Sequence, residues 1–364
     1  MTIALKNRGL VDLIASSLTY GVFFLVMSAL IDPFGRKIDY LRISVTDRCD
    51  FRCTYCMDED VTFMSREHIL SLEEIVHVAK TFISMGTKRI RITGGEPLVR
   101  KNILWAIEQI ANTSGLEELT ITTNGSQLYK MAQSLLNAGV SRINISLDTL
   151  KAERFKLLTR RDKFQQVIDG IEIASKLPFK RLKINSVMLK NHNDDELFDL
   201  AQFALERKMD ISFIEEMPLG VITDHDRAST YMSSDNVIEA LGQKYQLTPS
   251  STTTSGPTRY YQVAGYDNKI GVISPHSHNF CDTCNRVRLT AEGRLLLCLG
   301  NEHSKDLKPI LRSTSYRATI DSKEHDSTEL KSAIIEALAL KPEKHHFNLD
   351  EAPQILRFMS ATGG

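Results

Sequence analysis

From about residue 72 the sequence alternates between amphipathic helical segments and short apolar runs, and this alternation limits the folds available to the chain. Residues 72–85 place apolar side chains on one helical face, and Arg89–Thr93 then has the pattern of a strand. The alternation continues to residue 214, and residues 40–44 have the pattern of an earlier strand. Strands separated by such helices form parallel βαβ units with right-handed crossovers. The sequence therefore predicts an α/β fold with about six such units.

Two α/β architectures fit this pattern, a doubly wound sheet and an incomplete barrel. Polar residues follow the predicted strands at their C-terminal ends, which is where barrels carry their sites. These polar segments are Thr93–Glu96, Thr122–Gly125, Ser146–Asp148 and Glu215–Pro218. Their positions favour the barrel.

The alternation stops after Leu241, and the composition changes with it. Residues 248–258 are rich in Ser, Thr, Gly and Pro, which is typical of a linker or an exposed loop. Short strand patterns follow. We expect a barrel over residues 31–245, a second region over residues 246–364 and a separate extension over residues 1–30.

The cysteines occur in two groups of three, far apart in the sequence. In a large chain, close cysteine spacings are more typical of metal ligands than of disulfides, and they indicate a reducing compartment. Lys and Arg total 45, as do Asp and Glu, so the net charge is zero. No global field therefore draws the protein to nucleic acid or to an anionic membrane.

The first group, Cys49, Cys53 and Cys56, has the spacing C-x3-C-x2-C in a loop after the first predicted strand. Three thiolates on one loop can each bind one iron of a cubane and leave the fourth iron open. S-adenosylmethionine can chelate that iron through its amino and carboxylate groups. The alternative is a structural zinc site, but such sites usually have four ligands, and no fourth His or Cys is near in the sequence.

The turn Gly94–Pro97 strengthens the cluster interpretation. Its glycines let the backbone approach a ligand closely, and the Glu96 carboxylate can accept a bond from an ammonium group. By itself this segment would be only a turn, and its weight comes from its combination with the cysteines.

The second group, Cys281, Cys284 and Cys298, has the spacing C-x2-C-x13-C and again supplies three ligands. A cluster and a zinc site fit this spacing equally well, because His276 and His278 lie just upstream and can complete a Cys3His site. The sequence leaves both interpretations open.

Two arginines, Arg286 and Arg288, follow Cys284 in a predicted strand. Alternate residues of a strand point the same way, so two guanidiniums beside a metal form an anion-binding surface suited to phosphates. The alternative is a solvated strand face.

Together, the two cysteine groups, the Gly94–Pro97 turn, the segment Asn285–Arg288 and the terminal Gly363-Gly364 resemble the GTP 3′,8-cyclases. These are radical S-adenosylmethionine enzymes, classed as lyases, that catalyse the first step of molybdenum cofactor biosynthesis. The similarity runs from about Leu30 to Gly364. The resemblance implies an incomplete (β/α)6 barrel, similar to a TIM barrel, whose open side is closed by the C-terminal region. It also implies two 4Fe-4S clusters, one at each cysteine triplet.

The resemblance further implies roles for individual residues. Contacts to S-adenosylmethionine fall on Tyr55, Gly95, Ser146 and Met217. Contacts to GTP fall on Arg42, Arg91, Thr122, Lys183, Arg286, Val287 and Arg288. The catalytic group comprises Cys49, Cys53, Cys56, Arg286, Arg288, Gly363 and Gly364. One departure is Asp50, where the family often has Asn, which adds a negative charge beside the first cluster.

The implied reaction starts with a 5′-deoxyadenosyl radical that removes hydrogen from the ribose C3′ of GTP. The C3′ radical then adds to C8, and reduction gives (8S)-3′,8-cyclo-7,8-dihydroguanosine 5′-triphosphate. The implied partners are an electron donor such as flavodoxin or ferredoxin and a cyclic pyranopterin monophosphate synthase that takes the product. A homodimer is left open. The rival functions are a radical enzyme whose second cluster only transfers electrons, and a zinc-binding protein without catalysis.

Residues 1–30 lie outside this resemblance. Leu13–Ile31 carries no charge and follows Lys6 and Arg8, so a targeting segment, a membrane anchor and a start codon placed too early all fit. The run barely reaches the ~20 apolar residues of a membrane span and lacks an A-x-A cleavage site. We favour a start at Met27 and a cytoplasmic enzyme, since export would expose oxygen-sensitive clusters. An organelle matrix is the alternative if the extension is a targeting segment.

Overall fold

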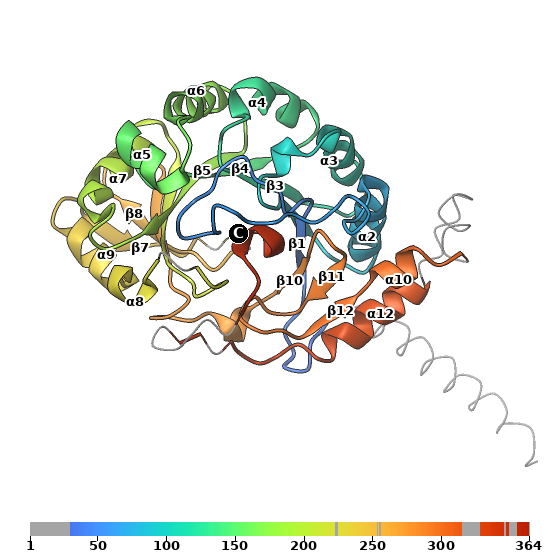
Figure 1. Cartoon of the computed structure of the whole chain (residues 1–364). Helices are drawn as coiled ribbons and strands as arrows, with labels where there is room; N and C mark the ends of the chain where they lie inside the picture. Colours follow the sequence, from blue (N-terminus) through green and yellow to red (C-terminus); the bar gives the residue numbers. More distant parts are fainter. Residues whose placement is uncertain are drawn as a thin grey trace, which may run out of the picture.

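The computed structural model describes residues 30–222, 225–252, 254, 256–314, 328–345, 347–348 and 355–363. Its framework is one sheet with the strand order β12-β11-β10-β1-β2-β3-β4-β5-β6-β9-β8-β7. The sheet curves into a barrel that stays open between β7 and β12, and the helices lie on its outside (Figure 1). Residues 1–29 of the extension and Gly364, which was expected in the catalytic group, lie outside the described residues.

Six central strands follow one another in chain order, and each pairs in parallel with the next. They are β1 (Tyr40–Ser44), β2 (Arg89–Thr93), β3 (Glu118–Thr123), β4 (Arg142–Ser146), β5 (Arg181–Met188) and β6 (Asp210–Glu215). The segments between them and after β6 include α2 (Leu72–Ser84), η1 (Pro97–Val99), α3 (Ile103–Ala111), α4 (Leu128–Asn137), α5 (Ala152–Thr159), α6 (Phe164–Ser175), η2 (Asp194–Glu196), α7 (Leu197–Glu206), α8 (Arg227–Thr230) and α9 (Ser234–Gly242). The predicted α/β class is confirmed.

The strands bury apolar side chains beneath the helices and turn polar side chains towards the barrel interior. In β2, Ile90 and Ile92 join the hydrophobic core with residues of α2, whereas Arg91 lines an internal cavity. This follows from strand geometry, because successive side chains point to opposite faces. The α2 helix begins at Ser71, whose hydroxyl accepts from the Glu74 N–H in a capping box. The core therefore lies between the sheet and its helices, and the interior of the barrel is left polar.

The C-terminal region extends this sheet at both edges. β10 pairs in parallel with β1, and β9 pairs in parallel with β6, so eight parallel strands lie side by side instead of about six. Antiparallel strands then continue each edge. The elements of this region are β7 (Leu247–Pro249), β8 (Arg259–Val263), β9 (Lys269–Ile273), η3 (Cys281–Thr283), β10 (Arg286–Leu289), β11 (Arg294–Leu296), β12 (Ser304–Asp306), α10 (Lys308–Leu311), α12 (Thr328–Leu338) and α13 (Met359–Thr362).

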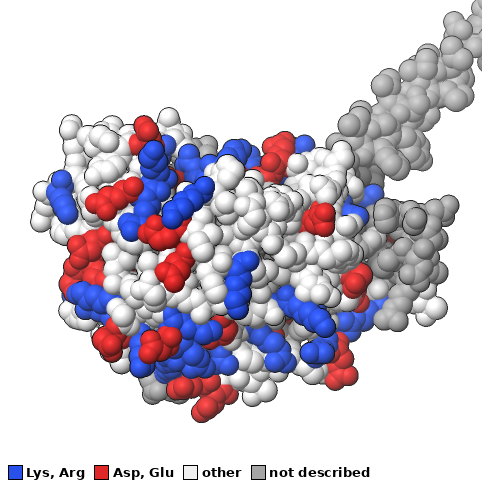
Figure 2. Space-filling model, turned by 90° about the horizontal axis from the view of Figure 1, so that it is seen from above, with Lys and Arg blue, Asp and Glu red and all other residues white. Residues whose placement is uncertain are grey.

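The surface carries no single dominant charge on the face drawn in Figure 2, where Lys and Arg side chains are interspersed with Asp and Glu. This agrees with the zero net charge of the sequence. Among the described helices, none combines the length and the hydropathy that a membrane crossing requires.

Candidate active site

The first cysteine loop leaves β1 and is held against the end of β2. The Gly95 N–H donates to the Thr46 carbonyl (2.8 Å), and the Glu96 N–H donates to the Arg48 carbonyl (2.8 Å). A Cβ on Gly95 would overlap the Arg48 carbonyl and lie 2.7 Å from the carbonyl oxygen of Asp47. Glycine is therefore needed here because the cysteine loop itself passes so closely.

The Glu96 carboxylate has a structural role. Its oxygens accept from the Thr123 hydroxyl (2.8 Å), the Asn124 N–H (2.6 Å) and the Leu98 N–H (3.0 Å). The residue is fully buried, and burial raises the pKa of its carboxyl group to about 8. The sequence analysis expected the Glu96 carboxylate to accept a bond from the ammonium group of a ligand, but it accepts from these protein donors instead. Their hydrogen bonds join the ends of β2 and β3.

Asp50 fastens the loop to the segment after β3. Its carboxylate accepts from Asn124 (2.8 Å) and Ser126 (2.7 Å) and pairs with Lys163 (3.3 Å). Burial acts to raise the pKa of Asp50, but these hydrogen bonds and the ammonium outweigh it and lower the pKa. The extra negative charge expected beside the first cluster is therefore neutralised within the chain.

Tyr55 ties the loop across the barrel mouth. Its hydroxyl donates to Asp148 (2.6 Å), which follows β4, and the other oxygen of Asp148 accepts from the Val187 N–H (2.8 Å). Burial raises the pKa of Asp148 to about 6. The hydroxyl of Tyr55 is thus directed to a protein group, and a contact to S-adenosylmethionine is left to its ring or backbone.

All six cysteines are free thiols, and those of the first group are partly buried. Burial raises the pKa of Cys49 and of Cys56 to about 12, and that of Cys53 well above its ordinary value. Thiols in such surroundings ionise when a metal binds them. Three soft sulfur donors on one loop suit iron and sulfide, so the residues present fit a cluster.

Within the described residues, no three His, Cys, Asp or Glu side chains lie close enough to hold one metal ion. A cluster does not require this arrangement, because each thiolate binds a different iron. The first group is therefore compatible with a cluster as the structure stands.

The second cysteine group lies in a more electropositive setting. Cys281 and Cys284 are on and just after η3, and Cys298 follows β11. Burial acts to raise the pKa of Cys284, but the charges of Arg286 and Lys341 outweigh it and lower the pKa to about 7. All three cysteines line one cavity.

The two histidines proposed as zinc ligands are engaged elsewhere. The ring of His276 forms a hydrogen bond with the Glu216 carbonyl (2.9 Å), and burial lowers its pKa. The ring of His278 meets the Asp235 carboxylate at 2.8 Å. The Cys3His alternative has no support in these contacts.

Six cations line the interior of the barrel. Arg142 is paired with Glu118, and the other five are Arg42, Arg91, Lys183, Arg286 and Arg288. Arg288, Arg42 and Arg91 are register partners on β10, β1 and β2. Within the described part of the chain, none of the five forms an ion pair with a carboxylate, although 20 other ion pairs are present. The interior therefore concentrates positive charge, and Glu118, a carboxylate that lines the same cavity, is already paired with Arg142.

The pKa values of these cations reflect that crowding. Burial, followed by Arg288 and Arg91, lowers the pKa of Arg42 well below its ordinary value. Burial, followed by Arg91, does the same for Lys183, and burial and Arg286 lower the pKa of Arg288 to about 9. A bound anion would relieve both the desolvation and the mutual repulsion.

The C-terminal segment enters the barrel, and the chain end lies at the centre of the ring in Figure 1. Gly363 has φ +74°, and its carbonyl accepts from Arg288. A Cβ on Gly363 would overlap Thr93 at the end of β2. The backbone N–H of Ser360 also approaches the Cys56 thiol and acts to lower its pKa.

Most of the remaining expected site residues also face the interior. The cavity that contains the second cysteines is lined by Met217 and by residues of β10, including Val287. The side chain of Val287 lies in the hydrophobic core, so only its backbone can meet a substrate. The Thr122 hydroxyl is buried without a partner among the described atoms, and Ser146 is the register partner of Asn185.

Sequence reasoning missed Tyr40 as part of the site, and it placed Asp148 after a strand end without assigning it a contact. Tyr40 stacks with Arg42 and Arg91 at 5.8 and 5.6 Å from the ring centroid. Alternation along β1 places Tyr40 and Arg42 on the same face, which is the signal that could have identified Tyr40. No comparable signal links Asp148 to Tyr55, because their contact crosses the barrel.

Residues 43–204 match the Radical SAM superfamily, and residues 209–347 match the family described as Molybdenum Cofactor Synthesis C. Among solved structures, SuiB of Streptococcus suis bound to S-adenosylmethionine aligns with a TM-score of 0.55 and 15% identity over 90% of this chain and 78% of that one. A second structure of SuiB gives 0.56 and 14% over the same shares. At these identities the likeness shows the fold alone. The fold and the three-cysteine loop define a radical S-adenosylmethionine protein, which uses S-adenosylmethionine and an iron–sulfur cluster.

Closer relatives give the family. The GTP 3′,8-cyclase of Ectopseudomonas mendocina is 56% identical over 335 residues, which cover 92% of this chain and 98% of that protein. GTP 3′,8-cyclase 2 of Pseudomonas aeruginosa is 54% identical over 337 residues, 93% of this chain and 99% of that protein. The chain belongs to the GTP 3′,8-cyclase family. The family and enzyme class expected from the sequence are confirmed.

The substitution Gly95→Ala should displace the first cysteine loop, because the new methyl group meets the backbone of Asp47 and Arg48. We expect a loss of about 1–3 kcal/mol in the free energy of unfolding by urea, and less iron bound per chain. Gly242→Ala is the matched control, since nothing lies within 4 Å of its added methyl group. Wild-type stability and iron content in Gly95→Ala would show that the loop has room to move.

Proposed function

We propose that the protein converts GTP to (8S)-3′,8-cyclo-7,8-dihydroguanosine 5′-triphosphate, the first step of molybdenum cofactor biosynthesis. The observation that carries the proposal is the group of five interior cations without carboxylate partners. Buried charges without counter-charges are costly, and a triphosphate supplies several negative charges to planar guanidinium donors. The family relationship supports GTP as the nucleotide.

Each cysteine triplet is proposed to hold one 4Fe-4S cluster, the first facing S-adenosylmethionine and the second facing the guanine of GTP. When bound and reduced, the first cluster supplies the electron that cleaves the sulfonium of S-adenosylmethionine. The chain then has to orient the nucleotide and keep water and oxygen away. Supporting this, the cavity at the second triplet also contains Arg286, Arg288 and Met217.

The C-terminal segment is proposed to complete the substrate site. The Gly363 carbonyl engages Arg288, so the tail adjusts how much of that guanidinium is available to phosphate. The bridge between Leu219 and Ile355 holds the start of the segment near Met217. Gly363 and Arg288 thus act as positioning groups in the proposed reaction.

Anaerobically purified protein, incubated with dithionite, S-adenosylmethionine and GTP, should form 5′-deoxyadenosine and a cyclised nucleotide together. Two 4Fe-4S clusters predict about eight irons per chain. The formation of 5′-deoxyadenosine at the same rate without GTP, and no cyclised product, would favour a different radical enzyme. Zinc in place of iron and sulfide would overturn the proposal.

Arg42→Met should weaken GTP binding by about tenfold or more, since charge-assisted hydrogen bonds contribute about 1.5–3 kcal/mol. The thermal midpoint should stay the same or rise, because a buried cation without a counter-charge is removed. Anaerobic calorimetry with GTP and thermal unfolding measure the two effects.

The matched control is Arg142→Met, which removes an arginine that is paired with Glu118 at 3.1 Å. We expect this variant to lower the midpoint, because it leaves a carboxylate unpaired. Equal destabilisation by both substitutions would contradict a ligand-binding role for Arg42.

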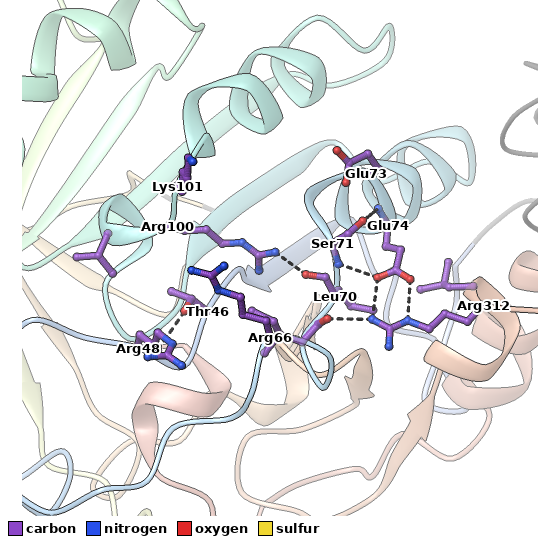
Figure 3. Close-up of a pocket in the computed structure, with 13 residues that line it drawn as sticks. Thr46, Arg48, Arg66, Leu70, Ser71, Glu73, Glu74, Arg100, Lys101 and Arg312 are labelled. Atoms are coloured by element: carbon purple, nitrogen blue, oxygen red, sulfur yellow. Dashed lines mark hydrogen bonds and ion pairs between the residues drawn. The ribbon is translucent and has the colours of Figure 1, made fainter.

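The proposed electron donor is an acidic protein such as flavodoxin or ferredoxin, and a groove beside the first cysteine loop offers it a docking surface. Figure 3 shows this groove of about 930 Å³, which is lined by five cations and two carboxylates. Arg48, which directly precedes Cys49, lies at one end. The exposed Arg66 and Lys101 form no ion pair with described residues, so both are available to a partner.

Reversing the charges of this groove with Arg66→Glu and Lys101→Glu should slow electron transfer from reduced flavodoxin to the enzyme by about tenfold at low salt. The rate of cluster bleaching measures this, and added salt should shrink the difference. Lys130→Glu with Lys176→Glu makes the same charge change on the outer helices as a control. Dithionite, which needs no docking surface, should reduce all variants alike. Unchanged rates of cluster reduction by flavodoxin would show that the donor docks elsewhere.

Further partners follow from the same proposal. The product is passed to cyclic pyranopterin monophosphate synthase, and a homodimer stays an expectation. A cytoplasmic location is proposed because free thiols and oxygen-sensitive clusters suit a reducing compartment.

A further inference from the structure

Lys341, which follows α12, is a buried lysine beside the second cysteine group. In the site described above it contributes only its charge, which acts to lower the pKa of Cys284. It is 3% exposed, and its ammonium donates to the carbonyl oxygens of Leu297 (2.6 Å) and Arg286 (3.2 Å). The same nitrogen lies 3.8 Å from the sulfur of Cys284. Lys341 therefore contacts the first residue of β10, which follows Cys284, and Leu297, which precedes Cys298.

No carboxylate of the described residues forms an ion pair with Lys341. Arg36, a second buried cation beside the same cysteine group, differs from Lys341 because it is paired with a carboxylate. Arg36 donates to the carbonyl of Cys281 (2.7 Å) and to that of Glu343 (2.7 Å), and it is paired with Asp32 at 2.6 Å. Arg36 thus has its counter-charge within the chain, whereas Lys341 lies beside the thiol of Cys284 and forms no ion pair with the described residues.

We infer that Lys341 is a positioning residue that supplies the counter-charge for the metal-bound thiolates of the second cysteine group. This rests on the proposed function, which places a cluster at that group. A thiolate-ligated cluster brings net negative charge next to the ammonium, and the low dielectric of a buried site strengthens their attraction. The charge of Lys341 therefore favours the reduced, more negative state of that cluster.

The contacts of Lys341 also connect the cluster to the substrate strand. One hydrogen bond ends on the backbone of Arg286, the first residue of β10, and another ends on Leu297, next to Cys298. β10 carries two of the five interior cations. A single ammonium thus fixes the distance between the second cysteine group and the arginines that face the nucleotide.

The test uses full-length protein in which Cys49, Cys53 and Cys56 are replaced by Ala, so that only the second group can hold iron. After anaerobic reconstitution, iron content and the midpoint potential are measured for the lysine and for three replacements. Lys341→Arg keeps the charge, Lys341→Gln keeps a hydrogen-bond donor, and Lys341→Met removes both. We expect Gln and Met to disfavour reduction by tenfold or more, which is about 59 mV for one electron, and Arg to stay near the lysine value.

Lys305→Gln, at an exposed lysine of β12 paired with Glu336, is the control and should leave the potential unchanged. A Lys341→Gln protein with the wild-type iron content and potential would overturn the inference. If Met alone loses its iron while Gln retains it with an unchanged potential, the lysine acts only as a hydrogen-bond donor, and the counter-charge role also fails. If the parent protein with an intact Lys341 binds no iron, the second cluster of the proposed function fails instead.

Discussion

Unbalanced positive charge inside the barrel is the constraint on which the rest of the site depends. Arg288, Arg42 and Arg91 occupy one register row across three adjacent strands, and no described carboxylate neutralises them. The three arginines stay in this row because each lies on a strand whose other face packs against helices. The repulsion among these buried cations is unfavourable, and a bound polyanion relieves it. The site therefore favours highly charged ligands whatever base they carry.

The sheet brings two distant parts of the sequence side by side. Because β10 pairs with β1, the second cysteine group lies beside the strand that delivers the first cysteine loop. The two groups sit in opposite electrostatic settings, with Glu96 near Cys49 and with Arg286 and Lys341 near Cys284. This difference supports the proposal of two clusters with different tasks, one that cleaves a cofactor and one that binds a substrate.

Local pattern was enough to predict much of the fold, and the motifs were enough to predict the family. The strand expected at Arg89–Thr93 has those bounds in the structure, and Arg91, for which the resemblance implied a contact to GTP, lines the internal cavity. Contacts between distant residues had no such signal. The ring of His276 faces a backbone carbonyl, the Glu96 carboxylate binds its neighbours, and β9 and β10 enlarge the parallel sheet. Each of these outcomes is decided by pairing across the barrel, which periodicity along the chain does not encode.

Because β1 pairs with β10, one edge of β1 has no partner until β10 has been synthesised. Asn285, which precedes β10, bonds to Asp39, which precedes β1, and the two are 246 positions apart. A ribosome adds about 5–20 residues per second, so the edge of β1 stays unpaired for on the order of 10 s or more after β1 has been synthesised. During that interval a nearly complete half-barrel presents an open strand edge, which is a template for wrong pairing. Productive folding of this chain in a cell therefore depends on protecting one nascent strand from other chains until about four fifths of the protein has been made.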